Sequence, residues 1–184
     1  MSFKSSFYHS LKMFRLDEKA IRSLSEDKHA TGWGIVFIIL AGIALAVGTM
    51  QVLPQMPALI ILGGPLLFLI VSFIGIAVLY LFSESLGGKG SFAPYYRTYS
   101  HMYFWNILAI LPFVGLILSS LVGIWQIIMA IYVTKVVRKV TLTKAAIVVL
   151  VPVLVIIILA VTTSKVYSLE LFAQWFMTFI QPTV

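Results

Sequence analysis

Long uncharged apolar runs separated by short polar stretches dominate the chain. Residues 33–53 form the first run and residues 58–83 the second. Because an α-helix rises about 1.5 Å per residue, about 20 apolar residues cross a hydrocarbon core of roughly 30 Å. Both runs are therefore predicted to be membrane-spanning helices. Pro54 and Pro57 lie between them and predict a tight hairpin, since proline ends one helix and is tolerated in the first turn of the next.

The third apolar run, residues 102–134, is too long for one crossing, because a single helix of that length would extend about 50 Å. The Pro-Phe-Val-Gly sequence at residues 112–115 supplies a break. It predicts a short span at about residues 97–111 and a longer one at about residues 113–134. A last span is predicted at about residues 144–163.

The basic residues report the topology. Twelve of the 13 Lys and Arg residues lie in three stretches, residues 1–32, 84–101 and 135–144. Basic residues near span ends are held on the cytoplasmic side. Five spans leave only Lys165 outside, whereas four spans would place nine basic residues inside and four outside. The predicted fold is therefore an all-α polytopic membrane protein with five transmembrane helices, a cytoplasmic N-terminus and an outside C-terminus.

Amphipathic patterns at both ends predict helices that lie in the membrane interface. Near the N-terminus, apolar residues recur at helical spacing beside Lys and Arg, which is typical of a helix in the headgroup region. Near the C-terminus, a second aromatic stripe opposes a polar one. The alternative for each stripe is packing on the helix bundle. The N-terminal stripe consists of Phe3, Phe7, Leu11 and Phe14, and the C-terminal one of Phe172, Trp175, Phe176 and Phe179. This divides the chain into residues 1–32, a transmembrane domain at 33–164 and a terminal segment at 165–184.

Composition excludes several classes of protein. Hydrophobic residues make up 61% and charged residues 10%, whereas soluble domains carry about 25% charged residues. The Lys and Arg residues that give the net charge of +7 lie near the ends of the spans. Anionic lipid headgroups are therefore favoured over nucleic acid as the counter-charge. The absence of cysteine removes disulfides, thiol catalysis and Cys-ligated metals. A multi-pass protein of the plasma membrane is expected, or of an endomembrane if the source is eukaryotic.

The predicted spans contain few chemically active side chains. Ion-coupled carriers place charged groups inside their spans, and four of the five spans predicted here contain none. The candidate polar lining is Asn106, Ser119, Ser120 and Gln126. These residues serve either interhelical hydrogen bonds or a polar pore. His9, His29 and His101 are far apart in sequence, so they do not form a readable metal site. With no nucleophile and base in sight, neither an enzyme nor a cofactor is expected.

Small residues and a glycine-rich loop complete the candidate features. Gly115, Ser119 and Gly123 share one face of the fourth span, and Gly42 and Ala46 share one face of the first. Such faces let another helix approach closely, either within the chain or in a second copy. The loop residues Gly87, Gly88, Lys89 and Gly90 do not match a phosphate-binding loop, because Gly90 stands where Ser or Thr should follow the lysine.

A basic cluster follows the fourth span. Lys135, Arg138, Lys139 and Lys144 fall within ten residues on the predicted cytoplasmic side. Each basic residue near an anionic membrane surface contributes about 1 kcal/mol of attraction. The cluster is therefore predicted to face lipid and to bind anionic headgroups.

Two segments resemble the Yip1 domain in its shorter prokaryotic form. They are LFSESLGGKGSFAPYYRTYS at residues 81–100 and the stretch from LPFVGLILSSLVGIWQ at residue 111 onward. The similar elements are the loop Gly87 to Gly90 with Phe92, the Leu-Pro-x-x-Gly break, Trp125, and Lys144-Ala145-Ala146 followed by Pro152. The resemblance covers about residues 12–165. It implies five spans with a cytoplasmic N-terminus, in agreement with the charge distribution.

The resemblance also shapes the functional expectation. Eukaryotic relatives are implied to act in vesicle trafficking and to bind prenylated Rab GTPases, but their long N-terminal region and Asp-Leu-Tyr-Gly-Pro signature are missing here. The expected function is a non-enzymatic scaffold or adaptor that organises or shapes membrane, with the bilayer, further copies or other membrane proteins as partners. The alternative is a small channel or permease.

Overall fold

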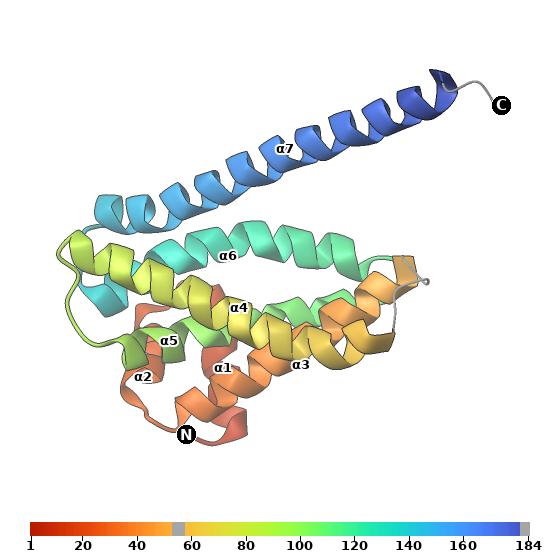
Figure 1. Cartoon of the computed structure of the whole chain (residues 1–184). Coiled ribbons are helices and arrows are strands. Elements are labelled where there is room, and N and C mark those ends of the chain that lie inside the picture. Colours follow the sequence, from red (N-terminus) through yellow and green to blue (C-terminus); the bar gives the residue numbers. More distant parts are fainter. Residues whose placement is uncertain (53–57, 181–184) are drawn as a thin grey trace. The chain divides into compact units, whose positions relative to one another are not determined.

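The structure is a computed structural model that describes the backbone of residues 1–52 and 58–180, and the side chains of residues 1–51 and 63–164. Every regular element in the described part is a helix (Figure 1). The elements are α1 (Phe3–Phe14), α2 (Glu18–Glu26), α3 (Ala30–Val52), α4 (Ala58–Ser85), α5 (Phe92–Ser100), the 3₁₀ helix η1 (His101–Ile110), α6 (Gly115–Arg138) and α7 (Leu142–Ile180).

Four stretches are long and apolar enough to cross a membrane. They are Ala30–Gln51, Gly63–Ser85, Gly115–Arg138 and Leu142–Ser164. These stretches coincide with the predicted first, second, fourth and fifth spans. The chain is thus a multi-pass membrane protein. The predicted hairpin at Pro54 and Pro57 lies outside the described residues.

The predicted third span differs from the structure. This segment is not one α-helix, because α5 is followed by ten residues of 3₁₀ helix. The break before α6 lies at Leu111 to Val114, as expected. A 3₁₀ coil is tighter than an α-helix, which suits the close packing of η1 between α3 and α6. A Cβ on Gly115 would lie 2.7 Å from the carbonyl oxygen of Leu108, and Gly48 likewise abuts the carbonyl of Ala109.

Chain contacts separate two units, Met1–Val149 and Leu150–Val184. The first contains α1 to α6 and the first two turns of α7, where Ala145, Val148 and Val149 are buried. The second is the remainder of α7, whose helix continues to Ile180. The predicted boundary at residue 165 therefore falls inside a continuous helix. The side chains of the predicted C-terminal stripe (Phe172, Trp175, Phe176 and Phe179) lie outside the described set.

A tight connection joins the two short N-terminal helices. The N–H of Asp17 donates to the carbonyl of Lys12 and that of Leu16 to Met13, the paired bonds that close a helix C-terminus when the chain turns left-handed. Leu16 takes that left-handed conformation with φ of 60°. The Asp17 carboxylate then caps α2 by accepting from the N–H of Lys19 at 2.8 Å. The helix pair packs against α3, α5, η1 and α6.

Candidate functional site

The end of the bundle that carries the α4–α5 loop is built around the guanidinium of Arg138. Of the side chains that the structure describes, this one is the largest that is fully buried. Its Nε donates to Ser83 Oγ at 2.7 Å and its Nη2 to the carbonyl of Gly88 at 3.2 Å, while Nη1 donates to the carbonyl of Gly90. The guanidinium also lies 4.1 Å from the centre of the Tyr80 ring. We call Arg138 with Tyr80, Ser83, Gly88 and Gly90 the arginine cradle.

The glycine-rich loop supplies the carbonyls of the arginine cradle. The N–H of Gly88 donates to the carbonyl of Ser83 and the N–H of Gly87 to the carbonyl of Glu84. This pair of bonds closes the C-terminus of α4 in the same way as that of α1. Gly87 and Gly90 have φ of 87° and 91°, the left-handed region that glycine occupies freely. A Cβ on Gly88 would lie 3.1 Å from Arg138 Nε. The three glycines therefore let the backbone turn and approach the guanidinium.

The arginine cradle holds its charge without a counter-ion. Within the described residues, no carboxylate oxygen lies within 4 Å of Arg138. A buried charge needs hydrogen-bond acceptors on every side, and here two carbonyls, a hydroxyl and an aromatic face provide them. Lys89 adds a return bond from its N–H to the carbonyl of Arg138 at 2.8 Å. Phe92 completes the loop by packing edge-on against Tyr80, with ring centres 5.4 Å apart. The arrangement locks the loop to the end of α6.

The prediction that Arg138 faces lipid is therefore wrong, because its side chain points into the bundle. The other members of the basic cluster occupy three different settings. Lys135 pairs with Glu18 of α2 at 2.8 Å. Lys144 donates to the carbonyl of Leu86 at 2.8 Å. Lys139 is exposed and ends α6 in the left-handed conformation, with φ of 54°. Three of the four side chains thus tie parts of this end together.

Helix α1 lies on the bundle in an orientation that the aromatic stripe alone did not predict. Its fully buried residues include Ser6 and Ser10, whose small size lets the helix approach closely. Phe7 packs edge-on against Phe104 at 5.0 Å, and Phe14 packs on Trp105 at 4.2 Å between ring centres. The row remains partly open, with Phe3 47% exposed and Phe7, Leu11 and Phe14 half-buried. The phenylalanine row therefore follows the edge of the contact.

Two tryptophans, one in α6 and one in α3, contact the two ends of α1. The indole N–H of Trp125 in α6 donates to the carbonyl of Phe14 at 3.0 Å. Trp33 in α3 lies edge-on to Phe3, with ring centres 5.1 Å apart. No pattern in the sequence brings these residues together. The only available signal was the spacing of aromatic residues in segments far apart along the chain.

Most of the residues in this geometry lie in a region that a family model matches. The family model of the Yip1 domain matches residues 13–163. The chain belongs to the Yip1 domain family. No curated protein and no solved structure gives a significant match. The matched region of this Yip1 domain begins at Met13 within α1 and includes the whole arginine cradle, α2 and the four candidate spans, apart from the last residue of the fourth.

The polar residues of the Yip1 domain bond to neighbouring groups within the bundle. Gln126 Nε2 lies 2.9 Å from Asn106 Oδ1 and 2.9 Å from the carbonyl of Met102, which joins α6 to η1. Ser120 Oγ donates to the carbonyl of Leu116 in its own helix, and Ser119 is buried. None of the four lines the cavities described below. The geometry matches the interhelical alternative for Asn106 and Gln126.

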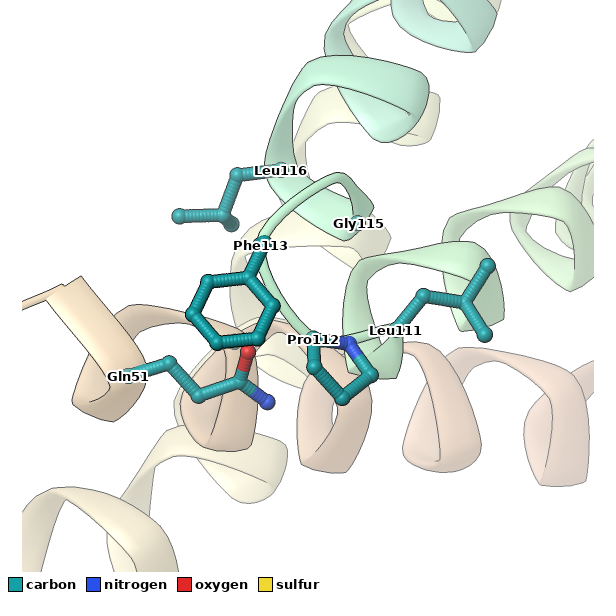
Figure 2. Close-up of a pocket in the computed structure, with 7 residues that line it drawn as sticks. Gln51, Leu111, Pro112, Phe113, Gly115 and Leu116 are labelled. Carbon is teal, nitrogen blue, oxygen red and sulfur yellow. The ribbon is translucent and has the colours of Figure 1, made fainter.

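A cavity of about 550 Å³ opens at the opposite end of this Yip1 domain, where η1 meets α6. Figure 2 shows Gln51 of α3 and the turn at Leu111 to Phe113 among its lining residues. Phe113 is 97% exposed and has φ of 62°, with the N–H of Val114 donating back to Pro112. Among the residues whose side chains the structure describes, no titratable group lines the cavity.

The small-residue faces of the Yip1 domain meet different surroundings. A Cβ on Gly42 would lie 2.8 Å from Pro65 Cα, and Ala46 lies near Gly64, so this face packs on α4. Gly115 packs on η1, whereas a Cβ on Gly123 would meet nothing within 4 Å. The face with Gly42 and Ala46 therefore packs within the chain. On the face of α6, Gly115 packs within the chain but Gly123 does not.

Proposed function

We propose that the chain is a non-enzymatic Yip1-family protein with five membrane crossings that organises or shapes its membrane as a scaffold or adaptor. Its partners in this proposal are the lipid bilayer with its anionic headgroups, and further copies or other membrane proteins. The proposed location is the plasma membrane, or an endomembrane if the source is eukaryotic. A GTPase partner is not part of the proposal.

The fifth crossing in this proposal is α5 with η1. Nine α-helical and ten 3₁₀ residues rise about 33 Å together, compared with about 28 Å for the same residues in an α-helix. That length matches a hydrocarbon core of roughly 30 Å. Arg97 lies near the loop end of this segment and donates to the carbonyl of Ser25 at 2.6 Å. A crossing here, together with the basic residues at the loop end, supports a cytoplasmic N-terminus and an outside C-terminus.

The observation that carries the membrane-shaping role is the placement of α1. The helix is held by buried serines and by tryptophans of the bundle, yet its phenylalanine row remains partly open beside Lys4 and Arg15, which are exposed. A helix with this pattern inserts its apolar edge into the headgroup boundary. Because α1 and α2 belong to one end of the bundle, they add area to one leaflet only. Unequal leaflet area favours curvature.

Reconstitution of the full chain tests this role. We expect proteoliposomes to become smaller as the protein-to-lipid ratio rises, when their diameters are measured by electron cryomicroscopy. Phe3→Gln should weaken the effect, since the 47% exposed Phe3 belongs to the row. Tyr8→Gln is the matched control, because Tyr8 is 53% exposed and lies off the row. Diameters that do not change with protein density, or that respond equally to both variants, would overturn the proposal.

A further inference from the structure

A polar cleft lies beside the arginine cradle, between α2, the start of α5 and the end of α6. Its volume is about 560 Å³, within the range of about 300–1,000 Å³ that is usual for ligand pockets. Four basic side chains line it, together with one carboxylate: Arg22, Lys28, Arg97 and Lys139, with Glu26. We call it the basic cleft.

The charges of the basic cleft are not neutralised by the protein. Within the described residues, the two ion pairs are Glu18 with Lys135 and Asp27 with the amino group of Met1. Neither pair uses a cation of the basic cleft, and no basic group in the described part of the chain lies within 4 Å of the Glu26 carboxylate. Three of the four basic residues are exposed and can move to meet a ligand. The cleft therefore presents positive charge that an anion would compensate.

Arg97 gives the basic cleft a fixed, buried element. Its side chain is only 7% exposed. Its Nε donates to Thr31 Oγ1 at 3.1 Å and its Nη1 to the carbonyl of Ser25. Nη2 has no protein acceptor in the described part of the chain. A guanidinium held in this way keeps donors in a fixed orientation, which suits the oxygens of a phosphate.

The first turn of α5 adds a second set of donors. Ser91 is its N-cap residue, but its side chain makes no capping hydrogen bond, and both Ser91 and Ala93 line the cleft. The N-terminus of a helix carries free N–H groups and a partial positive charge, both of which favour an anion. This helix N-terminus reinforces the site that the buried guanidinium and the three exposed cations already define.

We propose that the basic cleft binds a phosphate-bearing anion, with Arg97 as the fixed donor and Arg22, Lys28 and Lys139 closing around it. The phosphate belongs either to an anionic phospholipid headgroup or to a soluble phosphate, since both present the same oxygens. The site is distinct from the phenylalanine row of α1 that carries the proposed membrane-shaping role. Anion binding at the basic cleft can therefore be tested independently of any effect of the protein on membrane shape.

Calorimetric titration of the full chain in an uncharged detergent tests the basic cleft. The probes are dioctanoyl phosphatidic acid, dioctanoyl phosphatidylcholine and inorganic phosphate. We expect the phosphatidic acid to bind more tightly than the zwitterionic lipid. Arg22→Gln with Lys28→Gln should weaken that binding by about thirtyfold, which corresponds to about 2 kcal/mol for the loss of two cations near an anionic group. The matched control is Lys19→Gln with Lys89→Gln, which removes two exposed charges that lie outside both the cleft and α1.

The outcomes separate the sources of the phosphate. Competition by inorganic phosphate would show that a free phosphate occupies the cleft, whereas lipid binding without such competition would assign it to a phospholipid headgroup. Equal binding by the cleft variant and the control variant would overturn the proposal. So would equal affinity of the wild-type protein for the two lipids.

Discussion

Arg138 and Ser83 are 55 residues apart in the chain, and a 2.7 Å hydrogen bond joins the Arg138 Nε to the Ser83 Oγ. The bond connects the last residue of α6 to the last turn of α4. Because the same guanidinium also binds the carbonyls of Gly88 and Gly90, one side chain fixes two helices and the loop between α4 and α5. The glycine-rich loop of this Yip1 domain is, in this structure, the binding partner of an arginine.

Arg138→Gln should destabilise the protein strongly. The shorter amide cannot reach all three acceptors, so buried carbonyls lose their partners, and hydrogen bonds to charged groups contribute about 1.5–3 kcal/mol each. We expect a loss of about 2–4 kcal/mol, measured by unfolding in mixed detergent, with easier proteolysis of the loop. Lys139→Asn is the control, since Lys139 is exposed and Asn tolerates the left-handed conformation. Similar stability of the two variants would contradict the role of the arginine cradle.

Two glycines on one face of α6 should respond oppositely to the same change. Gly115→Ala places a Cβ against the carbonyl of Leu108, and overpacking of this kind destabilises by about 1–3 kcal/mol. Gly123→Ala meets open space and should be neutral or stabilising by up to about 1 kcal/mol through helix propensity. Thermal unfolding of both variants checks the difference. A loss at Gly123 equal to that at Gly115 would indicate that a second copy covers Gly123.

The tie between α2 and α6 should depend on pH. The hydrogen bond from Lys135 lowers the pKa of Glu18 from its ordinary value of 4.5. A carboxyl whose pKa is lowered on folding stabilises the fold above its unfolded pKa, and this contribution is lost as the pH falls through the folded pKa. Glu18→Gln should therefore lower the thermal midpoint near neutral pH but have no effect once the pH is well below 4.5. A difference between the two proteins that is the same at both pH values would contradict this tie.

The hydrogen bonds of Gln126 provide a test between packing and transport. Gln126→Leu removes both bonds to η1, and interhelical hydrogen bonds in membranes contribute on the order of 1 kcal/mol each. We expect a measurable loss of stability and no change in solute flux into proteoliposomes. Ser120→Ala is the control, because Ser120 bonds only within its own helix. Saturable flux that Gln126→Leu alters would instead support the channel or permease.

Hydropathy was enough to place the long helices, because a run of about 20 apolar residues is by itself the signal of a membrane-spanning helix. The four candidate spans begin and end within a few residues of the prediction, apart from the continuation of α7 to Ile180. The glycine spacing also indicated the loop after α4. These features are local, so a single stretch of sequence determines them.

The arginine cradle could not be predicted, because the acceptors of Arg138 come from about 50 residues earlier in the chain. A basic residue at a span end reads as lipid-facing unless those acceptors are known. The orientation of α1 was equally hidden, since an amphipathic pattern does not distinguish lipid from protein. The close packing of η1 against Gly48 and Gly115 of other helices was hidden for the same reason. Each of these features is set by tertiary contacts.

Cysteine labelling measures the proposed topology most directly, because the chain has no natural cysteine. Lys89→Cys marks the exposed loop beside the arginine cradle, and Phe113→Cys marks the exposed turn between η1 and α6. If α5 and η1 together cross the membrane, a membrane-impermeant maleimide applied to intact cells should label Phe113→Cys alone. Lys89→Cys should react only after the membrane is opened. Labelling of both positions from the same face would contradict the fifth crossing.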